Sequence, residues 1–149
     1  MPLLLGLIVG LAVSLLAGWW VKRARARREL ERYCLGPETL FGLLYPERKV
    51  LVFDIRQPLD LLAHSELIPG AVRIAPKEVL ANPALVPKDE DAVIYCTCPG
   101  DKTSRSVMQK VLALEFTKVK MLRGGLEGWK AKGYPVERYD KSFRLDTAS

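Results

Sequence analysis

The sequence predicts an α/β domain with a mostly parallel central sheet flanked by helices, preceded by one N-terminal transmembrane helix. Residues 3–21 carry no charged side chain. Beyond Gly36-Pro37, short apolar runs alternate with helical stretches, which is the pattern of an α/β domain. The chain has 149 residues, which leaves room for one domain of about a hundred residues after the anchor.

The segment from Leu3 to Val21 is long enough to cross a membrane. About 19 residues at a rise of about 1.5 Å span roughly 28 Å, close to the thickness of the hydrocarbon core. A cleaved secretory signal is the alternative, but no charged region precedes the segment, and Trp19 and Trp20 stand where small residues would mark cleavage. We therefore expect an uncleaved transmembrane anchor over residues 1–21.

The positive charge of the chain is concentrated directly after this segment. The formal net charge is +6, and most of it comes from Lys22, Arg23, Arg25, Arg27 and Arg28. Basic residues that flank a membrane helix stay on the cytoplasmic side. We expect a single-pass membrane protein with its N-terminus outside and its domain in the cytoplasm. Nucleic acid is not an expected partner, because no basic stripe runs along the domain itself.

Residues 22–36 are expected to form a basic juxtamembrane stalk that continues the membrane helix to Tyr33. Cys34, at its end, is interpreted as a plain thiol, with lipid attachment as the alternative. Gly6 and Gly10 form a G-x-x-x-G pair, through which two membrane helices could approach and form a homodimer.

The soluble domain is predicted over residues 37–140 and a polar C-terminal tail over 141–149. Strands are expected at Val50–Phe53, Val72–Ile74, Val93–Tyr95 and Val119–Leu122. Helices are expected around Glu38–Leu44, Leu59–Ala63, Lys77–Leu80, Ser104–Leu114 and Leu126–Lys132. Strands that alternate with helices form parallel sheets, and ligands bind beyond the carboxyl ends of such strands.

The segment that starts at Ala92 reads as a buried strand, a small polar loop with two thiols, Cys96 and Cys98, and then a helix. A cysteine between a strand end and a helix N-terminus meets unpaired backbone N–H groups and the positive end of the helix dipole, which favour its thiolate and can hold an anion. Lys102 and Arg105 would add positive charge. The alternative is that Cys96 is an inert buried thiol.

Cys34, Cys96 and Cys98 make an odd number of cysteines, so a disulfide framework is not expected. Zinc needs about four ligands, and only His64 and the distant Cys34 are available beside the Cys96–Cys98 pair. We expect no metal and no cofactor. A persulfide on one cysteine of the pair, resolved by the other, is chemically reasonable.

Three further motifs occur in order along the predicted domain. The first is Val52-Phe53-Asp54-Ile55-Arg56, the second is Ile68-Pro69-Gly70-Ala71, and the third is the segment from Gly124 to Trp129, followed by Gly133-Tyr134-Pro135-Val136. Together they resemble the rhodanese family, the thiosulfate sulfurtransferase-like domains. That family has a strand that ends in Asp-Val-Arg, an Ile-Pro-Gly-Ala turn and a closing G-G-x-x-x-W-x-x-x-G-x-P-V. The resemblance covers about Pro37 to Val136.

The resemblance implies a cysteine that accepts a sulfane sulfur as a persulfide and passes it to a nucleophilic acceptor. The family loop is typically Cys-x-x-Gly-x-Arg-Ser, and the loop here is two residues longer when it is counted from Cys96, which suggests a divergent subgroup with a Cys-x-Cys-Pro loop. Counting forward from the strand selects Cys96 as the nucleophile, and counting backward from Ser104 selects Cys98. We favour Cys96, because the strand fixes its position. Thr103 stands where the loop arginine is expected, so Lys102 or Arg105 would have to substitute.

The first hypothesis is therefore a membrane-tethered sulfurtransferase or persulfide carrier, with a small sulfur-containing substrate or a protein thiol as acceptor. In it the backbone from Pro99 to Ser104, including Gly100, cradles the anion, and Lys102 or Arg105 supports it. The second hypothesis is a non-catalytic interaction or redox-sensing module. The third is a phosphatase or arsenate-reductase-like enzyme, suggested by the enlarged loop and by the spacing of Cys98 and Arg105.

Overall fold

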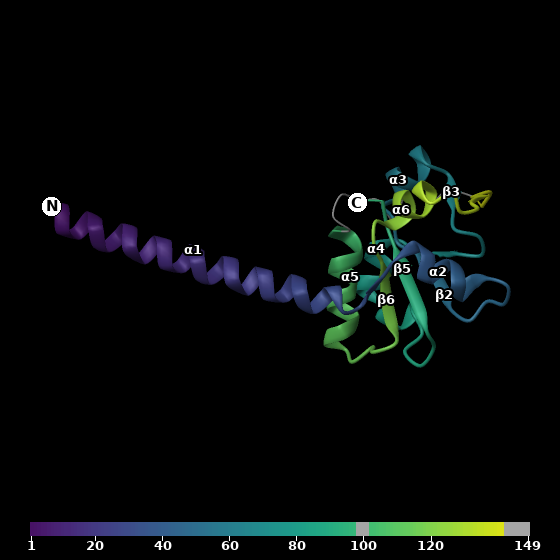
Figure 1. The fold of residues 1–149 in the computed structure, drawn as a ribbon, viewed down its shortest axis with the longest axis horizontal. Coiled ribbons are helices and arrows are strands. Elements are labelled where there is room, and N and C mark those ends of the chain that lie inside the picture. The colour runs from purple at the N-terminus through teal and green to yellow at the C-terminus, as the bar shows by residue number, and fades with distance from the viewer. Residues whose placement is uncertain (98–101, 142–149) are drawn as a thin grey trace. The chain divides into compact units, whose positions relative to one another are not determined.

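The computed structural model describes residues 1–97 and 102–141. The chain divides into two compact units, Met1–Arg32 and the remainder from Tyr33 onward (Figure 1). The first unit is a single helix and the second is the α/β domain. Each unit is described by itself below.

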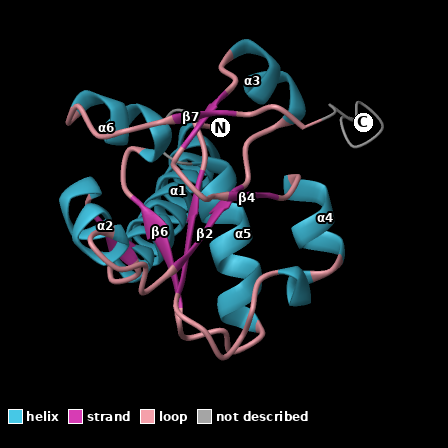
Figure 2. Ribbon diagram, turned by 90° about the vertical axis from the view of Figure 1, so that its right-hand side faces the viewer, coloured by secondary structure: helices cyan, strands magenta, loops and turns pink. Residues whose placement is uncertain are grey.

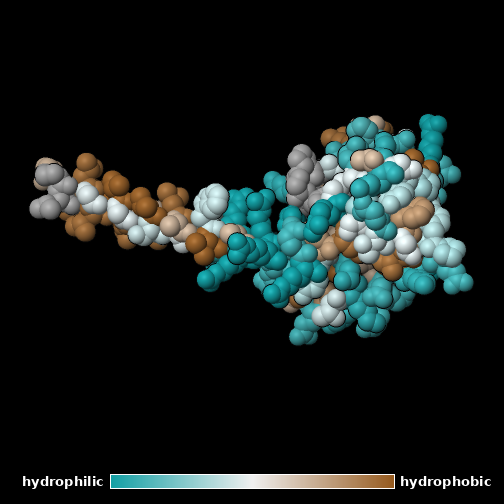
Figure 3. Space-filling model, in the orientation of Figure 1, coloured by the Kyte–Doolittle hydropathy of each residue, from teal (hydrophilic) through white to brown (hydrophobic). Residues whose placement is uncertain are grey.

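Helix α1 (Pro2–Glu31) makes up nearly all of the first unit. Large apolar side chains from Leu4 to Val21 are exposed along it, and the basic side chains follow (Figure 3). By length and composition α1 can cross a membrane, a test that a signal sequence at the same place would also pass. The helix continues into the basic segment as predicted and ends two residues before the expected end at Tyr33.

The second unit is built on a five-stranded sheet in the order β1-β6-β5-β2-β4, in which every neighbouring pair is parallel. The strands are β1 (Cys34–Leu35), β2 (Leu51–Asp54), β4 (Val72–Arg73), β5 (Ala92–Tyr95) and β6 (Val119–Leu122). The predicted parallel sheet is confirmed, and its four predicted strands lie within one or two residues of their expected ends. Strand β5 is central, so its carboxyl end lies in the middle of the sheet edge.

Helices connect the strands at the predicted places. They are α2 (Pro37–Leu44), α3 (Pro58–Ala63), α4 (Pro76–Ala81), α5 (Lys102–Ala113) and α6 (Gly125–Ala131). Helices α2, α3 and α4 each begin at a proline. Proline suits the first position of a helix, because its fixed φ is helical and its missing N–H would have no partner inside the helix. These three prolines therefore fix where the helices start.

Three short strands and a turn of 3-10 helix were not predicted. Strand β1 consists of Cys34 and Leu35, which the sequence analysis placed in the stalk; here they pair with Met121 and Leu122 of β6. Strands β3 (Glu66–Leu67) and β7 (Glu137–Arg138) form a separate antiparallel pair, and the 3-10 turn η1 covers Pro83–Leu85. A strand of only two residues carries no periodic signal, so it can be recognised only once its partner strand is known.

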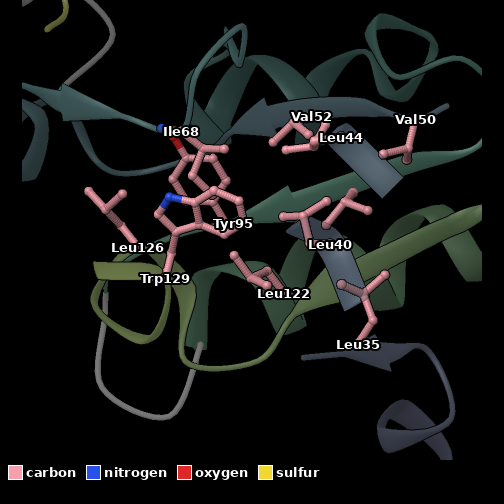
Figure 4. Packing of buried hydrophobic residues seen from close by; sticks show 11 residues of the cluster. Leu35, Leu40, Leu44, Val50, Val52, Ile68, Tyr95, Leu122, Leu126 and Trp129 are labelled. Carbon is pink, nitrogen blue, oxygen red and sulfur yellow. Dashed lines mark hydrogen bonds between the residues drawn. The ribbon is translucent and has the colours of Figure 1, made fainter. Parts of the chain in front are cut away.

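The sheet is covered on both faces, with α4 and α5 on one side and α2 on the other (Figure 2). On the α5 side, Val107, Met108 and Val111 are buried. The opposite side holds a cluster of eleven buried side chains that α2 and α6 share with strands of the sheet (Figure 4). Tyr95 of β5 and Trp129 of α6 are the largest of them, and both are fully buried. This core fixes the carboxyl end of β5.

Candidate functional site

Cys96 is the first residue after the central strand β5, and its side chain is buried. All four residues of β5 are buried, and the strand pairs with β2 on one side and β6 on the other. The backbone N–H of Leu126 donates to the Cys96 carbonyl at 3.1 Å. The position of Cys96 is thus set by two neighbouring strands and by α6.

Helix α5 begins at Lys102, on the other side of the loop that follows Cys96. Its first turn presents three kinds of side chain: Lys102 is exposed, Arg105 is partly buried, and Ser104 is fully buried. The Oγ of Ser104 has no hydrogen-bond partner among the residues that the structure describes. Buried hydroxyls are nearly always satisfied, so Ser104 is a candidate donor to a group bound beside the start of α5.

Two of the predicted site residues, Cys98 and Gly100, lie outside the described residues. The structure therefore describes Cys96, Lys102, Ser104 and Arg105 of the predicted site. Cys96 directly follows β5, and the other three lie in the first turn of α5. Within residues 1–97 and 102–141, no three His, Cys, Asp or Glu side chains gather as possible ligands of a metal ion.

A buried ion pair lies at the end of β2, and its arginine also binds the segment that follows α3. Arg56 and Asp54 are both fully buried, and the Arg56 Nε lies 3.0 and 2.8 Å from the two carboxylate oxygens of Asp54. The two terminal nitrogens of Arg56 donate to the carbonyls of His64 (2.7 Å) and Glu66 (2.8 Å). A buried charge persists only when it is paired and hydrogen-bonded, and this arginine meets both conditions.

Tyr95, directly before Cys96, belongs to the same network. Its hydroxyl donates to Asp54 Oδ2 at 2.9 Å and accepts from the N–H of Ile68 at 3.2 Å. Burial, together with the negative charge of Asp54, raises the pKa of Tyr95 well above its usual value. The tyrosine therefore remains a protonated donor, and it ties the residue next to Cys96 to the ion pair on β2.

Replacing Tyr95 with phenylalanine is expected to lower the free energy of unfolding by about 1–3 kcal/mol, because Asp54 loses a donor and the Ile68 N–H loses its acceptor. The loss should be smaller in alkali. Above about pH 10 an unfolded tyrosine loses the proton that the folded chain keeps, so this group's contribution to stability falls as pH rises toward its higher native pKa. Urea unfolding of a W19F/W20F chain, followed by Trp129 fluorescence at about pH 8 and about pH 11, measures both effects. An equal loss at the two pH values would contradict the argument.

The Ile-Pro-Gly-Ala turn is held by groups from distant parts of the chain. Gly70 has a positive φ of 71°, which glycine adopts without strain. Its N–H donates to Glu137 of β7 at 2.9 Å, and the Arg48 guanidinium donates to the Pro69 carbonyl at 2.5 Å. A side chain at Gly70 would collide with the Arg48 guanidinium. This second motif therefore supports the fold next to Ile68.

The third motif supports Cys96 from α6. Gly124 has a φ of 74°, and a Cβ there would lie 3.3 Å from the Gly128 Cα. The close approach lets α6 begin directly after β6, so that the Leu126 N–H reaches the Cys96 carbonyl. Trp129 is buried, and its Nε1 donates to the Pro135 carbonyl at 2.8 Å.

A Gly124→Ala substitution is expected to lower the free energy of unfolding by about 1–2 kcal/mol, because an L residue is strained at positive φ. Gly42→Ala is the matched control. Gly42 lies inside α2, nothing lies within 4 Å of a Cβ added there, and alanine favours helix more than glycine does. The control should therefore be neutral or stabilising in the same urea assay. A loss of the same size in both variants would show that the conformation of Gly124 is not the cause.

Sequence reasoning did not assign the network of Asp54, Arg56 and Tyr95 a role near Cys96. Asp54 and Arg56 were visible only as part of a motif, and Tyr95 only as the end of a strand. The available signal was the position of Asp54 and Arg56 at the end of a strand, since parallel neighbours end at the same sheet edge. The hydrogen bond between Tyr95 and Asp54 depends on β2 and β5 being neighbours in the sheet, which the sequence does not give.

Comparison with known proteins agrees with the fold. A family model described as "Rhodanese-like domain" matches residues 42–132. A sulfurtransferase from Allochromatium vinosum is 29% identical over 99 residues, which cover 66% of this chain and 89% of that protein. The full-length structure of a Lactobacillus plantarum protein matches with a TM-score of 0.66 at 21% identity, over 78% of this chain and 97% of the other. Thiosulfate sulfurtransferase from Pseudomonas aeruginosa matches with a TM-score of 0.56 at 26% identity, over 70% of this chain and 19% of that one.

Proposed function

Because the chain belongs to the rhodanese-like domain family, we propose that it is a sulfurtransferase or persulfide carrier, with Cys96 as its nucleophile and α1 as its membrane anchor. A sulfurtransferase among its relatives supports the activity. The observation that carries the proposal is the placement of Cys96 at the carboxyl end of the central strand, before a helix whose buried Ser104 hydroxyl has no partner among the described residues.

The proposed reaction has two displacements at sulfur. The Cys96 thiol first loses its proton to solvent, and the N-terminal end of α5 favours the resulting thiolate. The thiolate attacks the outer sulfur of thiosulfate: an S–S bond forms to Cys96 Sγ, the bond to the sulfonate sulfur breaks, and sulfite leaves with the electron pair. An acceptor thiolate then attacks the outer sulfur of the persulfide, and Cys96 leaves as a thiolate.

The start of α5 is the proposed place for the anionic part of the donor. Its first N–H groups have no partner inside the helix, and the Ser104 hydroxyl can donate a further hydrogen bond. Lys102 and Arg105 lie in the same turn and add positive charge. Gly100 is proposed to belong to this cradle, because a residue without a side chain lets the backbone approach an anion closely.

Helix α1 is the proposed anchor, with the N-terminus outside and the domain in the cytoplasm. Its length and apolar composition support a membrane span, and the five basic residues that follow Val21 support this orientation. A tether would keep the domain close to a membrane-bound source or acceptor of sulfur.

Purified full-length chain in detergent, incubated with thiosulfate and a thiol acceptor, tests the proposed activity. We expect sulfite release and formation of a persulfide on the acceptor. Sulfate is the matched control, because it resembles thiosulfate in charge and shape but has no sulfane sulfur to transfer. A folded chain that releases no sulfite from thiosulfate, and transfers no sulfur to the acceptor from a low-molecular-weight persulfide, would contradict the activity.

One observation favours a second candidate, a non-catalytic interaction or redox-sensing module. The Cys96 side chain is only 1% exposed, whereas reactive cysteines are partly accessible. Alkylation with iodoacetamide separates the two functions. A reactive Cys96 should be labelled within minutes in the native chain, while a buried structural thiol should be labelled only after unfolding.

A homodimer through α1 is a further part of the proposal. Gly6 and Gly10 are four residues apart on one face of the helix, and nothing lies within 4 Å of a Cβ added at either. Replacing both with leucine is expected to abolish a crosslinked dimer in lipid vesicles, because the two backbones could no longer approach. An unchanged crosslinking yield in the double variant would exclude this contact.

A further inference from the structure

A groove on the surface of α1 lies where the apolar part of the helix meets the basic part. It is lined by Trp19, Trp20, Arg23, Ala24 and Arg27. Its volume is about 180 Å³, equal to about six water molecules at about 30 Å³ each, which is enough for a phosphate group. It combines two aromatic rings with two guanidinium groups, so its ligand should have an anionic part next to an apolar part.

The two arginines of the groove are suited to a phosphate. The Arg23 guanidinium lies over the ring of Trp19, with its Cζ 5.1 Å from the ring centroid. This stacking holds the guanidinium against the helix at a defined depth. Arg27 lies one helical turn further on the same face. Arginine binds phosphate oxygens through two parallel N–H groups, a geometry that lysine lacks.

The charge of the surrounding helix also selects an anion. No Asp or Glu occurs before Glu29, and the uncharged segment of residues 3–21 ends next to the groove. If that segment spans the bilayer, the tryptophans lie at the level of the lipid headgroups, where tryptophan side chains are enriched in membrane proteins. The phosphate nearest to the groove would then belong to a lipid.

We propose that this groove binds the phosphate headgroup of an anionic phospholipid, in the leaflet next to the basic segment. The proposal rests on the proposed membrane anchoring. The apolar edges of Trp19 and Trp20 would contact the start of the acyl chains, while Arg23 and Arg27 hold the phosphate. Basic residues attract anionic lipids in general, but here two of the five are set in a groove and the others are not.

This distinction provides a matched control within the same helix. At about 100° per residue, Arg25 lies on the face opposite the groove, and Lys22 lies beside Arg25. The double variants R23Q/R27Q and K22Q/R25Q therefore remove the same charge from the same segment of the chain. They differ in whether the groove keeps its guanidinium groups.

The test uses full-length chain in vesicles of phosphatidylcholine and phosphatidylglycerol, extracted in mild detergent, with the retained lipid measured by mass spectrometry. Wild type is expected to retain phosphatidylglycerol preferentially. R23Q/R27Q should lose that preference by at least about fivefold, whereas K22Q/R25Q should lose less than about twofold. Carbonate extraction of the vesicles reports insertion of the helix in every variant.

Each other outcome has a definite meaning. Equal losses in the two double variants would overturn the groove, because surface charge alone would then explain lipid retention. Displacement of the retained lipid by excess inorganic phosphate would assign the groove to free anions and overturn the lipid assignment. Insertion without a preference for phosphatidylglycerol would overturn this proposal alone, whereas failure to insert would overturn the membrane anchoring and this proposal together.

Discussion

Replacing Cys96 with serine is expected to lower the rate of sulfite release from thiosulfate by more than about 1,000-fold, because the attacking sulfur is removed. A serine hydroxyl forms no persulfide, so the variant should retain no added sulfur. The side chain is buried and the replacement is small, so the fold should survive. The measurement is steady-state sulfite release by the full-length chain in detergent, with the folded fraction checked by Trp129 fluorescence in a W19F/W20F background.

Cys98→Ser is the matched control for this prediction. If Cys96 alone attacks the donor, the control should keep sulfite release within about tenfold of wild type. If Cys98 resolves the persulfide on Cys96, the control should form the persulfide but pass the sulfur on more slowly. The reverse pattern, with full activity in Cys96→Ser and none in Cys98→Ser, would assign the nucleophile to the position that counting backward from Ser104 selects.

Arg56→Met is expected to lower the free energy of unfolding by about 3–5 kcal/mol, the largest stability effect we expect in this chain. The substitution leaves the fully buried Asp54 carboxylate without its cation, and it leaves the carbonyls of His64 and Glu66 without their donor. Urea unfolding, followed by Trp129 fluorescence in the W19F/W20F background, measures the change.

Two further variants separate this cause from a general effect of losing a positive charge. Lys130→Met breaks the ion pair with Glu66, whose two side chains are 35% and 43% exposed, and it should change stability little because water screens exposed pairs. The double variant Asp54→Leu/Arg56→Met removes the unpaired carboxylate and should recover part of the loss. If Lys130→Met were as damaging as Arg56→Met, burial of the Asp54–Arg56 pair would not explain its importance.

The central part of the fold could be predicted from the sequence because its signals are local. Strand β5 and helix α5 each have a clear apolar pattern, and a proline marks the start of α2, α3 and α4. Strand β1 could not be predicted in the same way. Its two residues follow a helix-forming segment, and they are a strand only because they pair with Met121 and Leu122, far along the chain. Strands β3 and β7 depend on each other for the same reason.

The position of the candidate site could be predicted from the sequence, but the hydrogen-bond network around it could not. Cys96 could be found from the order of strand, loop and helix, and it does directly follow β5. Arg56 could not be predicted as a buried residue, because arginine is rarely fully buried without a partner, and its partners come from two segments, the end of β2 and residues 64–66. Likewise, the burial of Ser104 depends on the packing of α5 against the sheet. Two statements remain predictions: that Cys96 is the nucleophile, and that the longer loop marks a divergent subgroup.

The most direct test of the account is to locate the sulfur that the chain accepts. Full-length protein is treated with thiosulfate, digested under non-reducing conditions, and the peptide that contains Cys96 and Cys98 is fragmented in a mass spectrometer. We expect the mass of one added sulfur atom on Cys96. Added sulfur on Cys98 would contradict the assignment of the nucleophile, and a folded chain with no added sulfur on either cysteine would contradict the sulfurtransferase function itself.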